Sequence, residues 1–147
     1  MLSDTLKVLL ATSYGFAIKA QNFHWNVEGP DFPQYHKFFG KIYEEVFENA
    51  IDQTAEYVRI LGSYTPGSFT RLVELCQIKD QLMIPRAELM IAELTQDNEK
   101  LLSMWKDAFT VAEQANEQGI CDFIASRIDA HGKHGWMLKS TLKKERA

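Results

Sequence analysis

The sequence predicts an all-α protein built as a four-helix bundle. Apolar residues recur at spacings of three and four along four long stretches, and the four prolines lie near the ends of these stretches, where they leave helices uninterrupted. No stretch alternates as a β-strand would. The 147 residues are 46% hydrophobic, which is enough to bury one core, so we expect a single domain over residues 1–147.

The first two helices form the N-terminal half. The first is expected from about Ser3, which can cap it, to about Val27. The second begins near Pro33, a residue suited to a first turn, and continues to Gly62, which stops it.

A longer connection follows and contains a short extra helix, predicted over Phe69–Cys76 with Ser68 as its cap. The third long helix runs from about Pro85 to about Glu117 and is ended by Gly119. The fourth runs from about Cys121 to about Lys144. Its side chains expected to face inward are Ile124, Ile128, Trp136, Leu138 and Leu142.

Charge and cysteine content narrow the function classes. The net charge of −4 argues against nucleic acid as the default partner. The two cysteines are isolated and form no CxxC pair, which is typical of a reduced, cytoplasmic protein. The longest uncharged run near the start, Val8–Ile18, is too short to span a bilayer, and no basic leader precedes it, so we expect no membrane association.

The residues best suited to chemistry lie between His24 and Glu56. His24 and His36 flank a turn rich in glycine and proline, and Asp52 and Glu56 follow on the second helix. A spacing of four places the two carboxylates on one helical face. Imidazole and carboxylate groups together suit iron.

The segment HWNVEG at His24, the residues Phe32, His36 and Tyr43, and the segment DQTAE at Asp52–Glu56 resemble the Dps family of mini-ferritins. The segment HGKHGWMLKS, residues 131–140, also resembles the last helix of that family. The resemblance implies a ferritin-like bundle, with subunits that assemble into a hollow twelve-subunit shell. It further implies that iron is oxidised with peroxide at a dimer interface and stored as ferric oxide, which protects against oxidative damage.

The same resemblance implies a ligand set. His24 and His36 of one chain would face Asp52 and Glu56 of a second chain, and iron would be the bound metal. Trp25 would lie beside the iron and quench radicals by being oxidised in place of a nucleic acid.

Two departures from the family pattern affect this site. The separation between His36 and Asp52 is 52 − 36 = 16, one residue more than in the family, and one extra residue rotates the rest of an α-helix by about 100°. We therefore predict a π-bulge between Tyr43 and Asp52, most readily within residues 44–48, that restores the register. Gly40 also stands where many members carry an acidic side chain.

Other interpretations stay open. Histidines and acidic residues on helices are usually structural or solvated, so the chain can instead be a structural or interaction protein that has lost ferroxidase activity. His131 and His134 share one helical face, but a packing or surface role is favoured over a metal site. A di-iron site inside one bundle is disfavoured, because it requires Glu-x-x-His on two helices and the second and fourth helices have none.

The apolar and charged residues of the helices predict which partners the protein has. The second helix carries Phe38, Phe39, Phe47 and Tyr57, more large apolar groups than one inner stripe needs, which predicts a homo-oligomer built from twofold dimers. DNA binding is doubtful, because the basic end is short and is better explained as charge that complements a helix C-terminus. This basic end consists of Lys139, Lys143, Lys144 and Arg146.

Overall fold

The computed structural model describes residues 1–143, which contain helices and no strands. In chain order the elements are α1 (Leu2–Asn26), α2 (Phe32–Val46), the π-helix η1 (Phe47–Ile51), α3 (Asp52–Ile60), α4 (Phe69–Leu75), α5 (Ala87–Gln114) and α6 (Gln118–Leu142). The segments α2, η1 and α3 follow one another without a break and form the second long helix of the predicted bundle.

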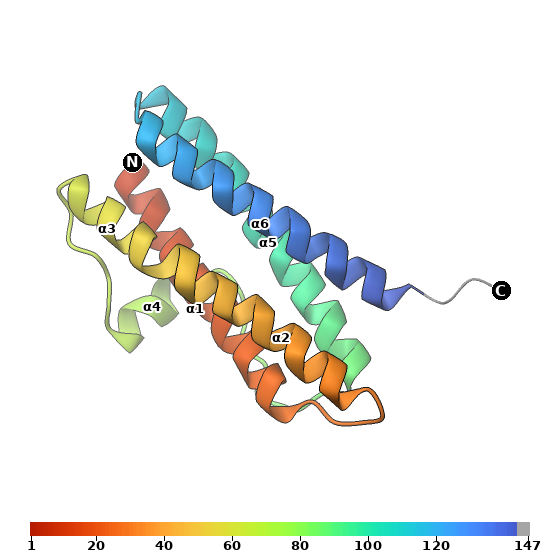
Figure 1. The fold of residues 1–147 in the computed structure, drawn as a ribbon. Coiled ribbons are helices and arrows are strands. Elements are labelled where there is room, and N and C mark those ends of the chain that lie inside the picture. Colours follow the sequence, from red (N-terminus) through yellow and green to blue (C-terminus); the bar gives the residue numbers. More distant parts are fainter. Residues whose placement is uncertain (144–147) are drawn as a thin grey trace.

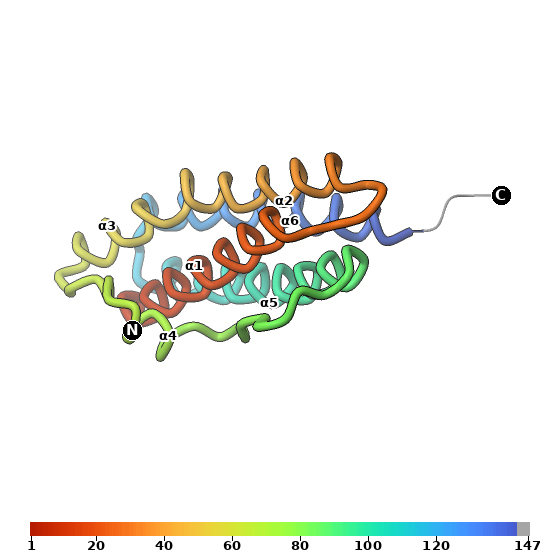
Figure 2. Tube along the Cα trace, turned by 90° about the horizontal axis from the view of Figure 1, so that it is seen from below, coloured from red at the N-terminus to blue at the C-terminus, as the bar shows by residue number. Residues whose placement is uncertain are grey.

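The four long helices pack as two hairpins, α1 with α2–η1–α3 and α5 with α6 (Figure 1). The connection between the hairpins carries α4 and runs along the outside of α1 and α5 (Figure 2). As a result α5 begins at the end of the bundle where α2 also begins. This is the arrangement of a four-helix bundle with one long crossover, as predicted.

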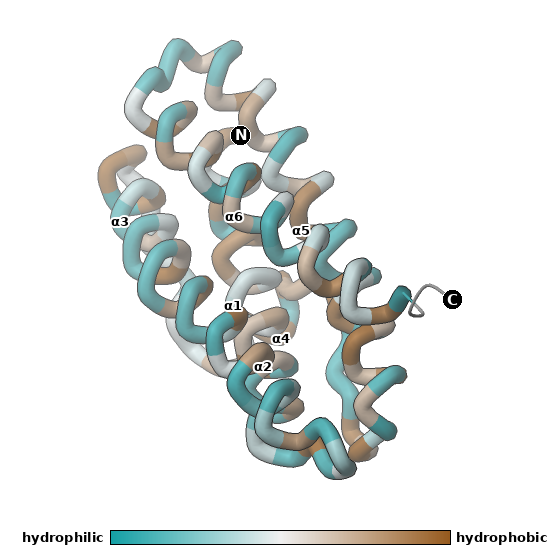
Figure 3. Tube along the Cα trace, turned by 45° about the vertical axis from the view of Figure 1, so that its right-hand side comes forward, coloured by the Kyte–Doolittle hydropathy of each residue, from teal (hydrophilic) through white to brown (hydrophobic). Residues whose placement is uncertain are grey.

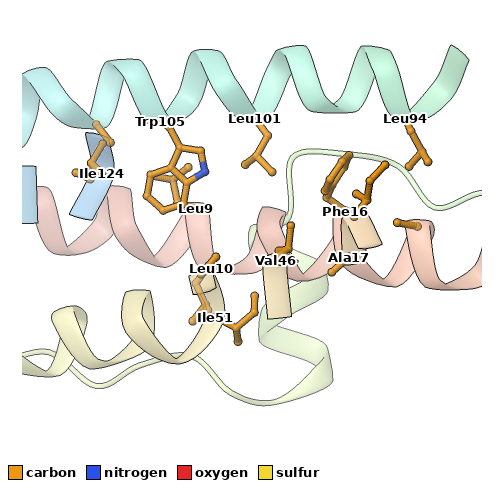
Figure 4. Close-up of a cluster of buried hydrophobic side chains, with 14 of the residues drawn as sticks. Leu9, Leu10, Phe16, Ala17, Val46, Ile51, Leu94, Leu101, Trp105 and Ile124 are labelled. Atoms are coloured by element: carbon orange, nitrogen blue, oxygen red, sulfur yellow. The ribbon is translucent and has the colours of Figure 1, made fainter. Parts of the chain in front are cut away.

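The core lies between the helices and is mainly aliphatic and aromatic. In Figure 3 apolar and polar residues alternate along each long helix, as expected for amphipathic helices. Leu94, Leu101 and Trp105 project from α5 toward α1, and Trp105 lies beside Leu9 (Figure 4). All four side chains are fully or almost fully buried, so truncating any of them would leave a cavity.

The helix ends confirm some of the predicted signals and correct others. Ser68 caps α4 by accepting a hydrogen bond from the backbone N–H of Arg71, and Gly62 ends α3 with a φ of +93°. Ser3 is not a cap, because α1 already begins at Leu2 and Met1 is its N-cap residue. The turn after α5 is made by Asn116, which adopts a φ of +57°.

Gly119 therefore does not end the third helix, since it lies inside α6. Two further expectations for α6 were wrong: the side chains of Trp136 and Leu142 are 68% and 40% exposed in the single chain. Of the basic end, Lys144 and Arg146 lie outside the described residues, whereas Lys139 pairs with Glu99 on α5 at 2.8 Å.

The predicted π-bulge is present, although it lies slightly further along the chain than expected. The π-helix spans Phe47–Ile51, between Tyr43 and Asp52. Side chains bind carbonyls around it: Gln53 donates to the oxygen of Glu48 at 2.9 Å and Thr54 to that of Ala50 at 2.6 Å. Both bonds run from the start of α3 back to carbonyl groups of the π-helix.

None of the helices within residues 1–143 combines the length and the apolar character needed to cross a membrane.

Candidate metal centre

His24 and His36 lie face to face where α1 and α2 meet near their joining turn. Their rings are stacked, with centroids 3.9 Å apart and planes inclined by 13°. His24 lies in the last turn of α1 and His36 near the start of α2, so the turn between the helices brings together residues twelve positions apart. Both side chains are half-buried.

Each histidine is held by the backbone of the other. The Nδ1 atom of His24 lies 2.5 Å from the carbonyl oxygen of His36, and Nδ1 of His36 lies 2.6 Å from the carbonyl oxygen of His24. A carbonyl oxygen can only accept, so each Nδ1 carries the proton. In the neutral rings both Nε2 atoms therefore have a free lone pair. Histidines that bind a metal usually have this arrangement, with the other ring nitrogen donating a hydrogen bond.

Aromatic rings extend the stack on both sides. Phe32 stacks on His36 with centroids 5.0 Å apart, and Tyr43 lies 5.3 Å from His24 at an inclination of 59°. Trp25, the neighbour of His24 in the chain, is 64% exposed and so is accessible to a diffusing oxidant or radical.

Gly40 is explained by its contact with His24. A Cβ atom at this position would lie 2.9 Å from Nδ1 and 3.0 Å from Cε1 of the His24 ring, closer than side chains pack. The acidic side chain that the family resemblance implies here would displace this imidazole. Glycine thus leaves room for the His24 ring, and it offers no side chain that could bind a metal.

We expect Gly40→Ala to disturb the histidine pair without unfolding the protein. The added methyl group must push the His24 ring from its hydrogen bond with His36, while the gain in helix propensity, about 1 kcal/mol, offsets much of the strain. Isothermal titration should show weaker metal binding with little change in melting temperature. Unchanged affinity would mean that the ring position is not important for binding.

Asp52 and Glu56 occupy the exposed face of α3, just after the π-helix. Within residues 1–143 neither carboxylate forms a hydrogen bond or an ion pair. On a straight α-helix, sixteen positions would place Asp52 about 160° around from His36, whereas fifteen would place it at about 60°. A π-helix between the two residues takes up one extra position, which is the change that the second value requires.

A single chain does not assemble the predicted ligands. Over the described part of the chain, no group of three or more histidine, cysteine, aspartate or glutamate side chains is placed to hold a metal ion. Within one chain the histidine pair and the acid pair, the two expected half-sites, stay apart.

His131 and His134 have a packing role, as favoured from the sequence. His131 is fully buried and His134 is 5% exposed. His134 Nε2 contacts Glu45 Oε1 at 2.8 Å, and Arg127 forms a two-pronged ion pair with the same carboxylate at 2.6 and 2.9 Å. Asn98 on α5 completes this network by bonding both the ring and the backbone oxygen of His131.

The network was missed from the sequence, although a signal for it existed. Arg127, His131 and His134 continue the inward spacing of α6, set by Ile124 and Leu138, at intervals of three and four. Polar residues on an apolar stripe predict buried hydrogen-bonded groups.

The electrostatics of the network are strong. Burial alone would raise the pKa of Glu45, but hydrogen bonds from His134 and Arg127 and the charge of Arg127 outweigh it and hold this pKa well below the usual range. Burial, together with the nearby charge of Arg127, lowers the pKa of His131 well below 6.5. The ring is therefore neutral at physiological pH.

Comparisons with known proteins agree with this architecture. The ferritin-like domain model matches residues 3–147. The chain is 35% identical over 136 residues to an uncharacterized low-temperature-induced protein of Nostoc, covering 91% of this chain and 75% of that protein. It is 31% identical to the DNA protection during starvation protein of Brevibacillus brevis, covering 86% and 84% of the two chains.

The crystal structure of Dps from Vibrio cholerae, described as a member of a broad superfamily of ferritin-like diiron-carboxylate proteins, superimposes with a TM-score of 0.92. The two sequences are 27% identical, and the match covers 97% of this chain and 89% of the other. The chain is a ferritin-like protein of the Dps family. Iron storage and DNA protection are general functions of the Dps family, and iron is the metal associated with the ferritin-like superfamily.

Proposed function

We propose that this protein oxidises and stores iron at sites formed between two copies of the chain. His24 and His36 of one copy face Asp52 and Glu56 of the other, and ferrous iron is the substrate. The observation that carries this proposal is the reciprocal hydrogen bonding of the two histidines, which leaves two Nε2 lone pairs without another partner in the described residues.

The chemistry of the two half-sites is complementary. Neutral imidazoles bind iron without adding charge, and two exposed carboxylates offset the charge that increases when Fe(II) becomes Fe(III). With peroxide as oxidant, two ferrous ions each give up one electron, and the peroxide takes up two protons to form two water molecules. This reaction consumes both reagents of radical formation, so it protects the cell from oxidative damage.

Trp25 has a protective role in this proposal. Its exposed indole adjoins His24 and can be oxidised by a radical that escapes the site, in place of a nucleic acid.

A homo-oligomer is required, because the half-sites are complete only when two copies meet. A twofold dimer forms two equivalent sites, each with histidines from one copy and acids from the other. Large apolar side chains near α3 and α4 are available for such contacts: Ile60, Tyr64, Phe69 and Val73 are between 73% and 89% exposed.

Mixing two inactive variants should restore activity. One variant carries His24→Ala and His36→Ala, and the other carries Asp52→Ala and Glu56→Ala. A mixed dimer has one intact site and one site that lacks all four ligands. Random reassembly makes half of the dimers mixed, so we expect about one quarter of the wild-type rate of ferric oxide formation.

Light scattering must show that both variants and the mixture keep the wild-type assembly. A monomeric wild-type protein at micromolar concentration, or a mixture that stays inactive although the chains exchange, would contradict the intersubunit site. Activity in either variant alone would place the oxidation elsewhere.

The second candidate function is a structural or interaction protein of the same fold without ferroxidase activity. Gly40 favours it, because this position offers no side chain to a metal. The mixing experiment separates the two candidates, since this alternative requires the wild-type assembly itself to be inactive.

We expect no tight binding to DNA. The net charge is −4, and Lys139 of the basic end is already paired with Glu99, both of which disfavour binding to the phosphates of a duplex. A mobility-shift assay at about 0.15 M salt should show free DNA. A retained band that disappears steeply as salt rises would contradict this expectation.

A further inference from the structure

A cavity lies between α1 and the short helix α4. It has a volume of about 630 Å³ and a mostly apolar wall. Tyr14, Gly15 and Ile18 of α1 form one side of the wall, and Leu72 and Cys76 form the other. None of these residues belongs to the histidine half-site or the acid half-site. A cavity of this size and character can receive a large apolar group.

The helix α4 is poorly covered in the single chain. It has seven residues, and none of them is buried. Phe69 and Val73 lie one turn apart on α4 and are strongly exposed, as are Ile60 and Tyr64 ahead of it. So short a helix has little stability of its own, and clustered exposed apolar side chains mark interaction sites. We therefore expect another surface to cover α4.

The expected half-sites define where a twofold axis must pass. The helix α1 runs antiparallel to the helix formed by α2, η1 and α3, with Tyr14 against Phe47. Asp52 is five residues beyond Phe47, so it lies level with about Leu9 of α1. His24 lies in the last turn of α1. An axis that brings each histidine half-site against the acid half-site of the other copy must cross α1 midway between these levels, at about residues 15–16.

The cavity and α4 lie at this same level. Residues 11–18 of α1 line the cavity, and α4 lies on the side of α1 opposite to α6 (Figure 1). A Cβ atom at Gly15 would lie 2.5 Å from Sγ of Cys76, so glycine allows the end of α4 to approach the middle of α1. A second copy related by the axis would place its own α4 against this region.

We infer that α4 of a second copy closes this cavity, and that Phe69 of each copy enters the cavity of the other. The inference rests on the two-copy arrangement of the proposed function. An axis at this level makes the contact reciprocal, so one face of α4 supplies both the inserted group and the rim of the cavity. Phe69 is suited to this contact because it is aromatic, almost fully exposed and located at the rim.

The contact also aligns the two copies. Two phenyl groups on opposite sides of the axis, each held by an apolar wall, prevent one copy from sliding along the other. Aromatic side chains buried in pockets near the centre of an interface usually carry much of its binding energy. The histidine and acid half-sites lie on either side of this contact along the helices, so their alignment depends on it.

Cross-linking through Cys76 tests the inference. The variant Phe69→Cys places a new thiol in the cavity of the other copy, where Cys76 forms part of the wall. Within one chain the two positions are seven residues apart, which is about 10 Å along a helix and too far for a disulfide. Copper–phenanthroline and oxygen remove two electrons and two protons from a pair of adjacent thiols to form one disulfide. We expect a covalent dimer on a non-reducing gel.

Two variants control for other contacts. Phe69→Cys/Cys76→Ser should form no covalent dimer. Thr70→Cys should form none either, because this exposed position points about 100° away from residue 69 on the same helix. If Phe69→Cys gives no covalent dimer in an assembly that light scattering shows to be intact, the inference is wrong. A covalent dimer that persists without Cys76 also overturns it, because α4 then meets a surface other than the cavity.

A second comparison does not depend on oxidation. Phe69→Asp/Val73→Asp should abolish the dimer at micromolar concentration and preserve the helical circular dichroism, because both side chains are exposed in the single chain. Leu82→Asp is the matched control, since Leu82 is an equally exposed apolar residue of the crossover that does not line the cavity. It should remain at least dimeric. A dimer that survives both aspartates would overturn the inference.

These results are separable from those on iron oxidation. A dimer that cross-links through Cys76 and oxidises no iron supports the inference and contradicts the proposed ferroxidase activity. Restored activity in the mixing experiment, without cross-linking through Cys76, overturns the inference and leaves the proposed function in place.

Discussion

Asp52→Ala should abolish iron oxidation and leave the fold and the assembly intact. Asp52 is exposed and bonds to no other described residue, so its removal should change the free energy of unfolding by no more than about 0.5 kcal/mol. The site, however, loses one of its two carboxylates and with it the balance of charge at the iron. Formation of ferric oxide from ferrous iron and peroxide, followed by absorbance, is the measurement.

Glu44→Ala is the matched control, because Glu44 is an exposed acid of α2 that the proposed site does not use. It should oxidise iron at the wild-type rate. If Asp52→Ala did so as well, the oxidation would have to occur at another place on the protein.

Glu45→Ala should be strongly destabilising. It leaves Arg127 buried without its carboxylate, and breaking a buried ion pair costs about 3–5 kcal/mol. We expect a loss near 3 kcal/mol, since Glu45 is partly solvated, measured as a lower urea midpoint. The double variant Glu45→Leu/Arg127→Met should recover most of the loss, because no charge is then left unpaired.

The same network predicts acid sensitivity. The depressed pKa of Glu45 gives stability that is present above pH 4.5 and is lost as the pH falls below that value. His131 adds a further loss of stability as the pH falls below about 6.5. In that range the unfolded chain binds a proton at this histidine and the folded chain does not.

His131→Gln isolates the second effect. Between pH 6.5 and 4.5 its free energy of unfolding should vary less with pH than that of the wild type. Chemical unfolding at several pH values measures the difference. Parallel curves for the two proteins would show that His131 is not the responsible group.

The long helices were predictable because apolar residues at spacings of three and four lie on one face only when the segment is helical. The extra residue could also be inferred from the sequence, because the spacing in the family is one residue shorter. One added residue rotates the rest of an α-helix by about 100°. Its location was predicted less well: the π-helix spans Phe47–Ile51, where Phe47 meets both Tyr14 and Tyr43 edge-on. The contact with Tyr14 joins two helices and is not visible in a local pattern.

Other features depend on contacts that no local pattern contains. Gly119 and Asn116 are both suited to a turn, and only the start of α6 decides between them. Gly40 appeared to be a lost ligand until its distance to the His24 ring gave it a steric reason. The Arg127–Glu45 pair joins residues 82 positions apart, which helical periodicity cannot relate.

The π-helix also affects how residues of this chain are matched with residues of its relatives. The family spacing implies one extra residue between His36 and Asp52, and the π-helix Phe47–Ile51 can hold it within a helix instead of a loop. Beyond that point, each side chain leaves the helix axis in the direction that the preceding residue would have on an uninterrupted α-helix. Homologous positions from Asp52 onward therefore have to be matched by the direction in which side chains leave the helix axis, since counting from His36 would shift each match by one residue.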